Sequence, residues 1–135
     1  MVLIDTNILA YLLIQGEQTD AAQRLRRRDP DWRSEAFIMV EFTNVLVGYT
    51  MAKRMTLALA RDLLEKAEIL LDGKLGRVSH PQALTSAARH RVTAYDARFL
   101  ALAQRIGLRL ITEDNKLRAA APALTQSLAE ALKAV

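Results

Sequence analysis

The chain has 135 residues, of which 51% are hydrophobic. This is enough for one domain with a substantial core, and it excludes a disordered chain. The absence of cysteine excludes a disulfide framework and a thiolate metal site, and it fits a reducing cytoplasm. A net charge of +4 and a pI of about 9.8 favour a polyanionic partner, although a basic surface without such a partner explains them equally well.

Short apolar segments predict strands at several places along the chain. Val2–Ile4 and Leu108–Ile111 are predicted strands, and Arg77–Ser79 is a candidate for a shorter one. Phe37–Val40 could be a strand or the start of a helix. The longest apolar run, Ile8 to Ile14, is far shorter than the roughly 20 residues that span a membrane, so no membrane segment is expected.

Helical spacing of apolar residues, capping residues and helix-breaking residues predict helices between these strands. The predicted helices are Ile8–Leu13, Asp20–Arg28 with Asp20 as its N-cap, Glu41–Ala52, Thr56–Leu71, Ser79–Arg91, Asp96–Ile106, Asn115–Ala120 and a C-terminal helix that opens with the capping box Ser127–Glu130. This alternation of strands and helices indicates an α/β fold with a mostly parallel sheet. Because no repeat or linker divides the chain, residues 1–135 are expected to form a single domain.

Four carboxylates lie beside apolar segments, where an isolated charge is costly. Asp5 and Asp114 each follow a predicted strand, Glu41 interrupts an apolar stretch, and Asp96 opens a predicted helix. In a parallel sheet, ligands bind beyond the carboxyl ends of the strands, so the fold can bring these acids together at that edge. Oxygen ligands of this kind suit a hard divalent cation. The sequence therefore predicts a metal site for phosphodiester chemistry.

Each acid also has a structural explanation. The three aspartates precede plausible helices and could act as N-caps, whereas Glu41 could form a buried ion pair with an arginine. Thr6 and Asn7 could support a carboxylate or a metal-bound water from a second shell, or Thr6 could cap a helix. That all four acids are purely structural is the less favoured interpretation.

These residues, in this order, resemble a PIN domain, and most closely the ribonuclease toxins of VapBC toxin–antitoxin pairs. The matching segments extend over nearly the whole chain and are residues 2–7 (VLIDTN), Glu41 with Asn44–Leu46, Tyr95–Ala97 followed by Leu100–Ala103, and Leu110–Asp114 followed by Lys116 and Leu117. The resemblance implies a PIN-like α/β/α sandwich, usually as a homodimer. It also implies that Asp5, Glu41, Asp96 and Asp114 bind metal and that Thr112 belongs to the catalytic group.

The resemblance further implies a cytoplasmic, Mg²⁺- or Mn²⁺-dependent endoribonuclease that cuts tRNA or rRNA with a metal-activated water. A VapB-like antitoxin would inhibit it by covering the cleft. Arg89, Arg91 and Arg98 are candidate contacts for substrate phosphates because they lie near Asp96 in the sequence. With only 5% aromatic residues, base stacking is expected to contribute little.

Two other functions remain open from the sequence. One is a catalytically silent protein of the same fold that only binds nucleic acid. The other is a nuclease of this fold that acts on DNA or in RNA processing. Four intact acids count against the binding-only function, since clustered negative charge would repel phosphate.

Overall fold

A five-stranded parallel sheet forms the centre of the computed structural model, which describes residues 1–133. The strand order is β3-β2-β1-β4-β5, and every pair of neighbouring strands is parallel. The strands are β1 (Val2–Ile4), β2 (Trp32–Glu35), β3 (Leu75–Gly76), β4 (Leu110–Ile111) and β5 (Thr125–Gln126). All carboxyl ends therefore lie at one edge of the sheet.

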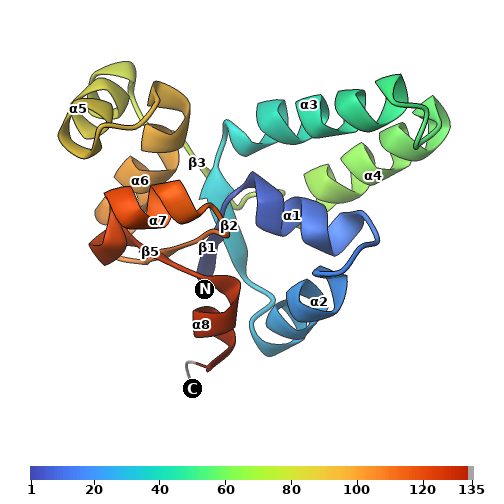
Figure 1. The fold of residues 1–135 in the computed structure, drawn as a ribbon, viewed down its shortest axis with the longest axis horizontal. Helices are drawn as coiled ribbons and strands as arrows, with labels where there is room; N and C mark the ends of the chain where they lie inside the picture. The colour runs from blue at the N-terminus through green and yellow to red at the C-terminus, as the bar shows by residue number, and fades with distance from the viewer. Residues whose placement is uncertain (134–135) are drawn as a thin grey trace.

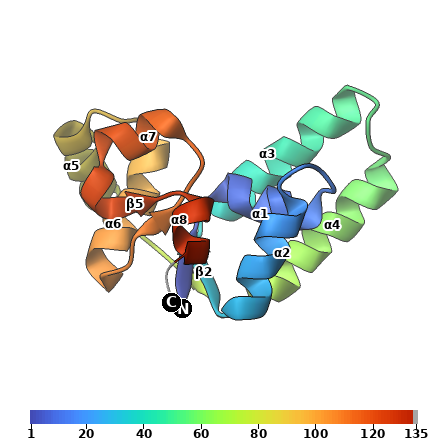
Figure 2. The same cartoon turned by 60° about the horizontal axis from the view of Figure 1, so that its bottom comes forward.

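Helices cover both faces of this sheet (Figures 1 and 2). They are α1 (Thr6–Leu13), α2 (Thr19–Arg28), α3 (Ile38–Met51), α4 (Leu57–Leu70), α5 (His80–His90), α6 (Ala94–Ile106), α7 (Asn115–Ala120) and α8 (Leu128–Lys133). Figure 2 shows α1 to α4 on one side and α5 to α7 on the other, which confirms the predicted α/β/α sandwich. Within residues 1–133, no helix combines the length and the apolar composition that crossing a membrane requires.

The strand predictions were wrong at several places. β2 was missed because its sequence, Trp-Arg-Ser-Glu, lacks an apolar pattern, yet three of its four residues are buried. The buried Ser34 hydroxyl donates a hydrogen bond to the carbonyl of Ile4 in the neighbouring strand, at 2.7 Å. Of the two alternatives for Phe37–Val40, the helix start is confirmed, since α3 begins at Ile38, whereas β3 lies before the predicted Arg77–Ser79 segment. β5 was not predicted at all.

Four helix starts also differ from the predictions: α1 begins at Thr6 instead of Ile8, α3 begins at Ile38 instead of Glu41, and the starts of α2 and α6 differ as well. Asp20 is not an N-cap but lies in the first turn of α2, after the N-cap Gln18. The helix α6 begins two residues early because the Thr93 hydroxyl accepts a hydrogen bond from the Asp96 N–H at 3.1 Å. Asp96 therefore lies inside the first turn of α6, and its carboxylate does not cap the helix. The predicted capping box of Ser127 and Glu130 at the start of α8 is confirmed. The predicted helix start at Ser79 is also confirmed, and there Ser79 and Gln82 form a capping box.

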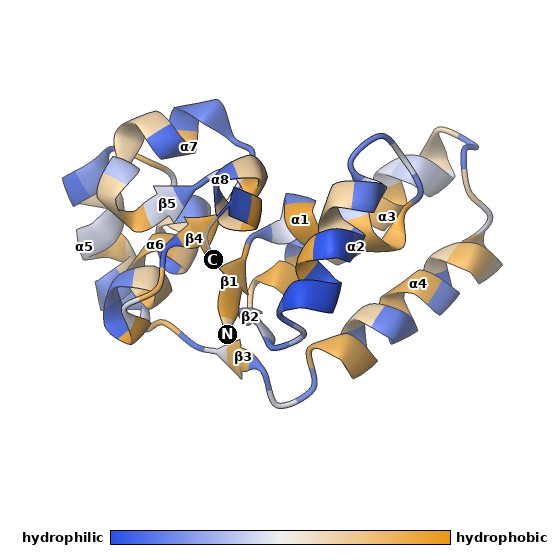
Figure 3. Ribbon diagram, turned by 90° about the horizontal axis from the view of Figure 1, so that it is seen from below, coloured by the Kyte–Doolittle hydropathy of each residue, from blue (hydrophilic) through white to orange (hydrophobic). Residues whose placement is uncertain are grey.

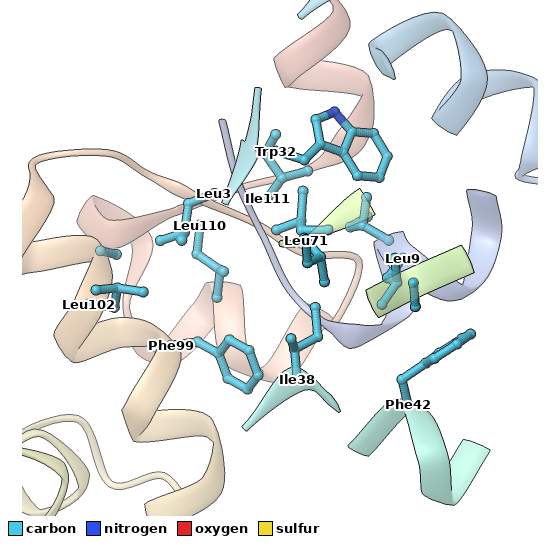
Figure 4. Packing of buried hydrophobic residues seen from close by; sticks show 14 of the residues in the cluster. Leu3, Leu9, Trp32, Ile38, Phe42, Leu71, Phe99, Leu102, Leu110 and Ile111 are labelled. Atoms are coloured by element: carbon cyan, nitrogen blue, oxygen red, sulfur yellow. The ribbon is translucent and has the colours of Figure 1, made fainter. Parts of the chain in front are cut away.

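The core lies where the central strands meet the helices. Leu3 and Leu110 of adjacent strands are fully buried, and Trp32, Phe42 and Phe99 extend the cluster to both sides (Figure 4). Figure 3 shows hydrophobic residues concentrated on β1 and β4, whereas α2 is largely hydrophilic. Burial of aromatic and branched side chains on both faces stabilises the sheet. The stable sheet in turn holds in place the edge from which the acids project.

The packing of α4 can be tested with two leucines of the same helix. Leu63 is 7% exposed and belongs to the core, whereas Leu57 is 62% exposed. We expect Leu63→Ala to lower the free energy of unfolding by about 2–5 kcal/mol through the cavity it creates. The matched Leu57→Ala variant should change it by less than about 0.5 kcal/mol. Urea denaturation followed by circular dichroism measures both, and equal losses would contradict this packing.

Candidate active site

The structure brings all four predicted acids to one open pocket of about 750 Å³ at the carboxyl edge of the sheet. Asp5 follows β1, Glu41 lies in the first turn of α3, Asp96 lies in the first turn of α6, and Asp114 precedes α7. Thr6 and Asn7 line the same pocket. Residues separated by more than a hundred positions in the chain therefore meet because parallel strands end at one edge.

Asp5 is the most deeply buried of the four acids, with 8% of its surface exposed. One of its oxygens accepts a hydrogen bond from the Ile8 N–H at 3.2 Å, so Asp5 also caps α1. Burial raises its pKa to about 7; hydrogen bonds from Thr112 and from the backbone oppose this rise, and the charge of Glu41 adds to it. Capping and site membership are thus combined in one residue.

Glu41 and Asp96 are half-buried and line the same pocket. Burial raises the pKa of both carboxyls, and repulsion from Asp96 adds to the rise at Glu41. Repulsion from Asp114 likewise adds to the rise at Asp96. A hydrogen bond from the Thr6 hydroxyl to Glu41, at 2.6 Å, opposes the shift at Glu41. The four acids therefore form a continuous series of repelling neighbours.

No cation of the described chain, residues 1–133, forms an ion pair with any of the four acids. The alternative explanation of Glu41 as half of a buried ion pair with arginine is therefore wrong. A nearby carboxylate, Glu113, pairs with Arg118 at 3.7 Å and accepts a hydrogen bond from the Leu128 N–H at 2.7 Å. Glu113 thus supports the start of α8 and is not among the residues that line the pocket.

Thr112 connects two of the acids from beneath the pocket. Its side chain is fully buried, accepts a hydrogen bond from the Asp114 N–H at 3.1 Å, and hydrogen-bonds to Asp5. Asp114 in turn accepts hydrogen bonds from the N–H groups of Lys116 and Leu117 and caps α7. The geometry therefore gives Thr112 a positioning role, since it holds acids in place and does not itself line the pocket.

The three arginines predicted to contact substrate lie elsewhere. Arg89 lines a separate groove between α5 and α6, and Arg91 is exposed at the end of α5. Arg98 donates a hydrogen bond to the Val78 carbonyl at 2.8 Å and contacts the His80 ring at 2.7 Å. The structure does not bring these side chains to the acidic pocket, and their contact with phosphates stays a prediction.

Sequence reasoning gave no role to several residues that line this pocket. Asn44 lies one helical turn after Glu41, so helical spacing could have identified it. The rings of Phe37 and Tyr95 stack with centroids 5.2 Å apart and planes 8° apart. Tyr95 directly precedes Asp96, but its pairing with Phe37 joins α6 to the start of α3 and has no local signal in the sequence.

The donor set fits a hard divalent cation, because its charged groups are carboxylates that form no ion pair with a cation of the described residues. As positioned in residues 1–133, no three acidic or histidine side chains are close enough together to hold a metal ion. Glu41 is turned toward Thr6, and Asp5 and Asp114 hold helix N–H groups. Metal binding would therefore require rotation of these side chains within the pocket.

Comparison with known proteins identifies the same fold. The chain is 27% identical over 134 residues to Ribonuclease VapC3 from Pyrobaculum aerophilum, covering 90% of this chain and 95% of that protein. The crystal structure of PAE2754 from the same organism superposes with a TM-score of 0.73 at 21% identity, covering 97% of this chain and 92% of the other. The family model described as PIN domain matches residues 2–122. On this match, the chain belongs to the PIN domain family.

Proposed function

We propose that this protein is a metal-dependent endoribonuclease and the toxin of a type II toxin–antitoxin pair. The observation that carries the proposal is the gathering of Asp5, Glu41, Asp96 and Asp114 in one pocket, where no cation of residues 1–133 forms an ion pair with them. Such a site attracts divalent cations, and phosphate becomes a favourable ligand only once they are bound. The similarity to a relative named as a VapC ribonuclease supports RNA as the substrate.

The roles of the residues follow from their positions. The four carboxylates would hold Mg²⁺ or Mn²⁺, which when bound activates water for attack on phosphorus and offsets charge on the phosphate oxygens. Thr6 orients Glu41 through its 2.6 Å hydrogen bond, and Thr112 fixes Asp5 relative to Asp114. Asn7, which is exposed and lines the pocket, would bond a carboxylate or a metal-bound water.

The biological assembly belongs to the same proposal. We infer tRNA or rRNA as the target, a VapB-like antitoxin as the inhibitor, a homodimer as the active form and the cytoplasm as the location. Exposed apolar side chains on α3 and α4 support a protein partner, since Val47, Met51 and Ile69 are 44%, 78% and 69% exposed. Purification together with the product of an adjacent gene would test the antitoxin assignment.

Removal of one acid should abolish cleavage without unfolding the protein. We expect Asp5→Asn and Asp96→Asn each to lower the rate of RNA cleavage by more than about a hundredfold. Loss of a residue that only supports a metal ligand costs up to about a hundredfold, so loss of a ligand itself should cost more. The measurement is cleavage of total cellular RNA with Mg²⁺, with Mn²⁺ or with EDTA.

The control is Asp62→Asn, because Asp62 is an exposed acid of α4 outside the pocket. It should cleave at the wild-type rate, whereas EDTA should stop cleavage by every variant. Undiminished cleavage by Asp5→Asn or Asp96→Asn would overturn the assignment of the acids. A folded wild-type protein that cleaves DNA but not RNA would replace the proposed substrate.

The stability of the metal-free protein should fall as pH rises from about 4 to about 7. Burial raises the pKa of Asp5 from 3.8 to about 7, so between these values the folded state holds a proton that the unfolded state has lost. Asn keeps the cap but carries no charge. In EDTA at pH 8, Asp5→Asn should therefore melt at a higher temperature than wild type, and the difference should vanish near pH 4.

Magnesium should reverse this order. Because the cation binds the folded state, Mg²⁺ at pH 8 should raise the melting temperature of wild type and of Asp62→Asn, but raise that of Asp5→Asn much less. Thermal unfolding measured by fluorescence at both pH values provides the comparison. Equal responses of Asp5→Asn and wild type to Mg²⁺ would show that Asp5 is not a ligand, independently of any activity.

A further inference from the structure

We propose that the Tyr95 ring is the platform on which one nucleobase of the RNA stacks beside the scissile phosphate. The proposal rests on the ribonuclease function proposed above and adds a residue that selects how RNA lies in the site. Tyr95 and the acids line the same pocket, and Tyr95 directly precedes Asp96 in α6. A base on this ring would therefore belong to a nucleotide next to the phosphate that the acids address.

The ring is held in place before RNA binds. Phe37 stacks on one face of Tyr95, with ring planes only 8° apart. The backbone N–H of Phe37 donates to both carboxylate oxygens of Glu35, at 3.3 and 3.4 Å, which restrains the backbone from which the Phe37 ring projects. Glu35 is only 2% exposed. A ring with a fixed orientation loses little entropy on binding, so stacking on it gives a larger net gain in affinity.

One face of the ring remains available for a ligand. Tyr95 stays 60% exposed although Phe37 stacks on its other face. Val40 and Val47 of α3, 60% and 44% exposed, add apolar surface to the same pocket. A pocket of about 750 Å³ also falls in the range of small-molecule sites, well above what metal ions alone occupy.

The chemistry of the pocket favours a nucleobase as the occupant. The carboxylates in its lining suit cations that hold a phosphate, and the aromatic and valine side chains in the same lining suit a flat, largely apolar ring. Although aromatic residues make up only 5% of the chain, stacking needs a single well-placed ring. The expectation from composition that stacking contributes little is therefore replaced, at this one position, by a specific contact.

Direct binding can be measured without cleavage. In Tyr95→Trp, a stacked base should quench the fluorescence of the new indole when oligoribonucleotides of adenine, guanine, cytosine or uracil are added. The native Trp32 is fully buried and should not respond. The control is Leu84→Trp, because Leu84 is 70% exposed on α5 and lies outside the acidic pocket. If the oligoribonucleotides quench the fluorescence of both variants equally, or do not quench that of Tyr95→Trp, the proposal that a base stacks on Tyr95 is overturned.

Cleavage kinetics test the same contact in the working enzyme. We expect Tyr95→Leu to lower kcat/KM by about tenfold, the effect of losing one stacked base, while Tyr95→Trp keeps most of it. Removing the base of one nucleotide beside the cleaved bond should cost wild type about tenfold too, but should cost Tyr95→Leu almost nothing. Non-additivity of this kind marks a direct contact and would not arise from a merely structural ring.

The outcomes separate the two proposals. If wild type cleaves RNA and loss of the base impairs Tyr95→Leu as strongly as wild type, the platform is wrong while the ribonuclease function stands. If wild type cleaves no RNA with any divalent metal, the ribonuclease function fails, and quenching in Tyr95→Trp alone then decides whether the ring stacks bases. Melting temperatures of both Tyr95 variants should match that of wild type, which excludes unfolding as the cause of any loss.

Discussion

The burial of carboxylates beside one another is the constraint on which this structure depends. Asp5, Glu41, Asp96 and Asp114 line one pocket, where burial and, to a smaller extent, repulsion from a neighbouring acid raise the pKa of Asp5, Glu41 and Asp96. Bringing them together costs free energy that no protein cation within residues 1–133 offsets. The fold must supply that free energy elsewhere, and the buried sheet and its helices do so.

Hydrogen bonds to the carboxylates offset part of this free-energy cost. Asp5 and Asp114 cap helices, so each carboxylate accepts backbone N–H groups that would otherwise lack partners. Thr6 holds Glu41, and the buried Thr112 links Asp5 to the backbone of Asp114. The structural and functional explanations of these acids are therefore compatible, because one carboxylate oxygen can cap a helix while the other is free to bind a cation.

The pocket combines two kinds of chemistry. Its lining includes the four carboxylates together with Phe37, Tyr95 and the valines of α3. Because Phe37 is the N-cap of α3 and Tyr95 lies in the first turn of α6, their stacking joins the starts of the two helices that carry Glu41 and Asp96. The same contact holds the ring that is proposed to receive a nucleobase, next to the acids that are proposed to bind metal.

The sequence by itself determined the α/β class, most helices, the strands β1 and β4, and the identity of the four acids. Those features depend on local pattern: apolar runs, helical spacing, and charges placed where an isolated charge is costly. Tertiary structure alone decided that Trp32–Glu35 is a strand, because its polar residues are buried only by neighbouring strands and by the bond from Ser34 to Ile4. It also decided the positioning role of Thr112, the location of Arg89 and Arg98 outside the pocket, and the pairing of Phe37 with Tyr95. These depend on contacts between residues far apart in the chain, which no local pattern records.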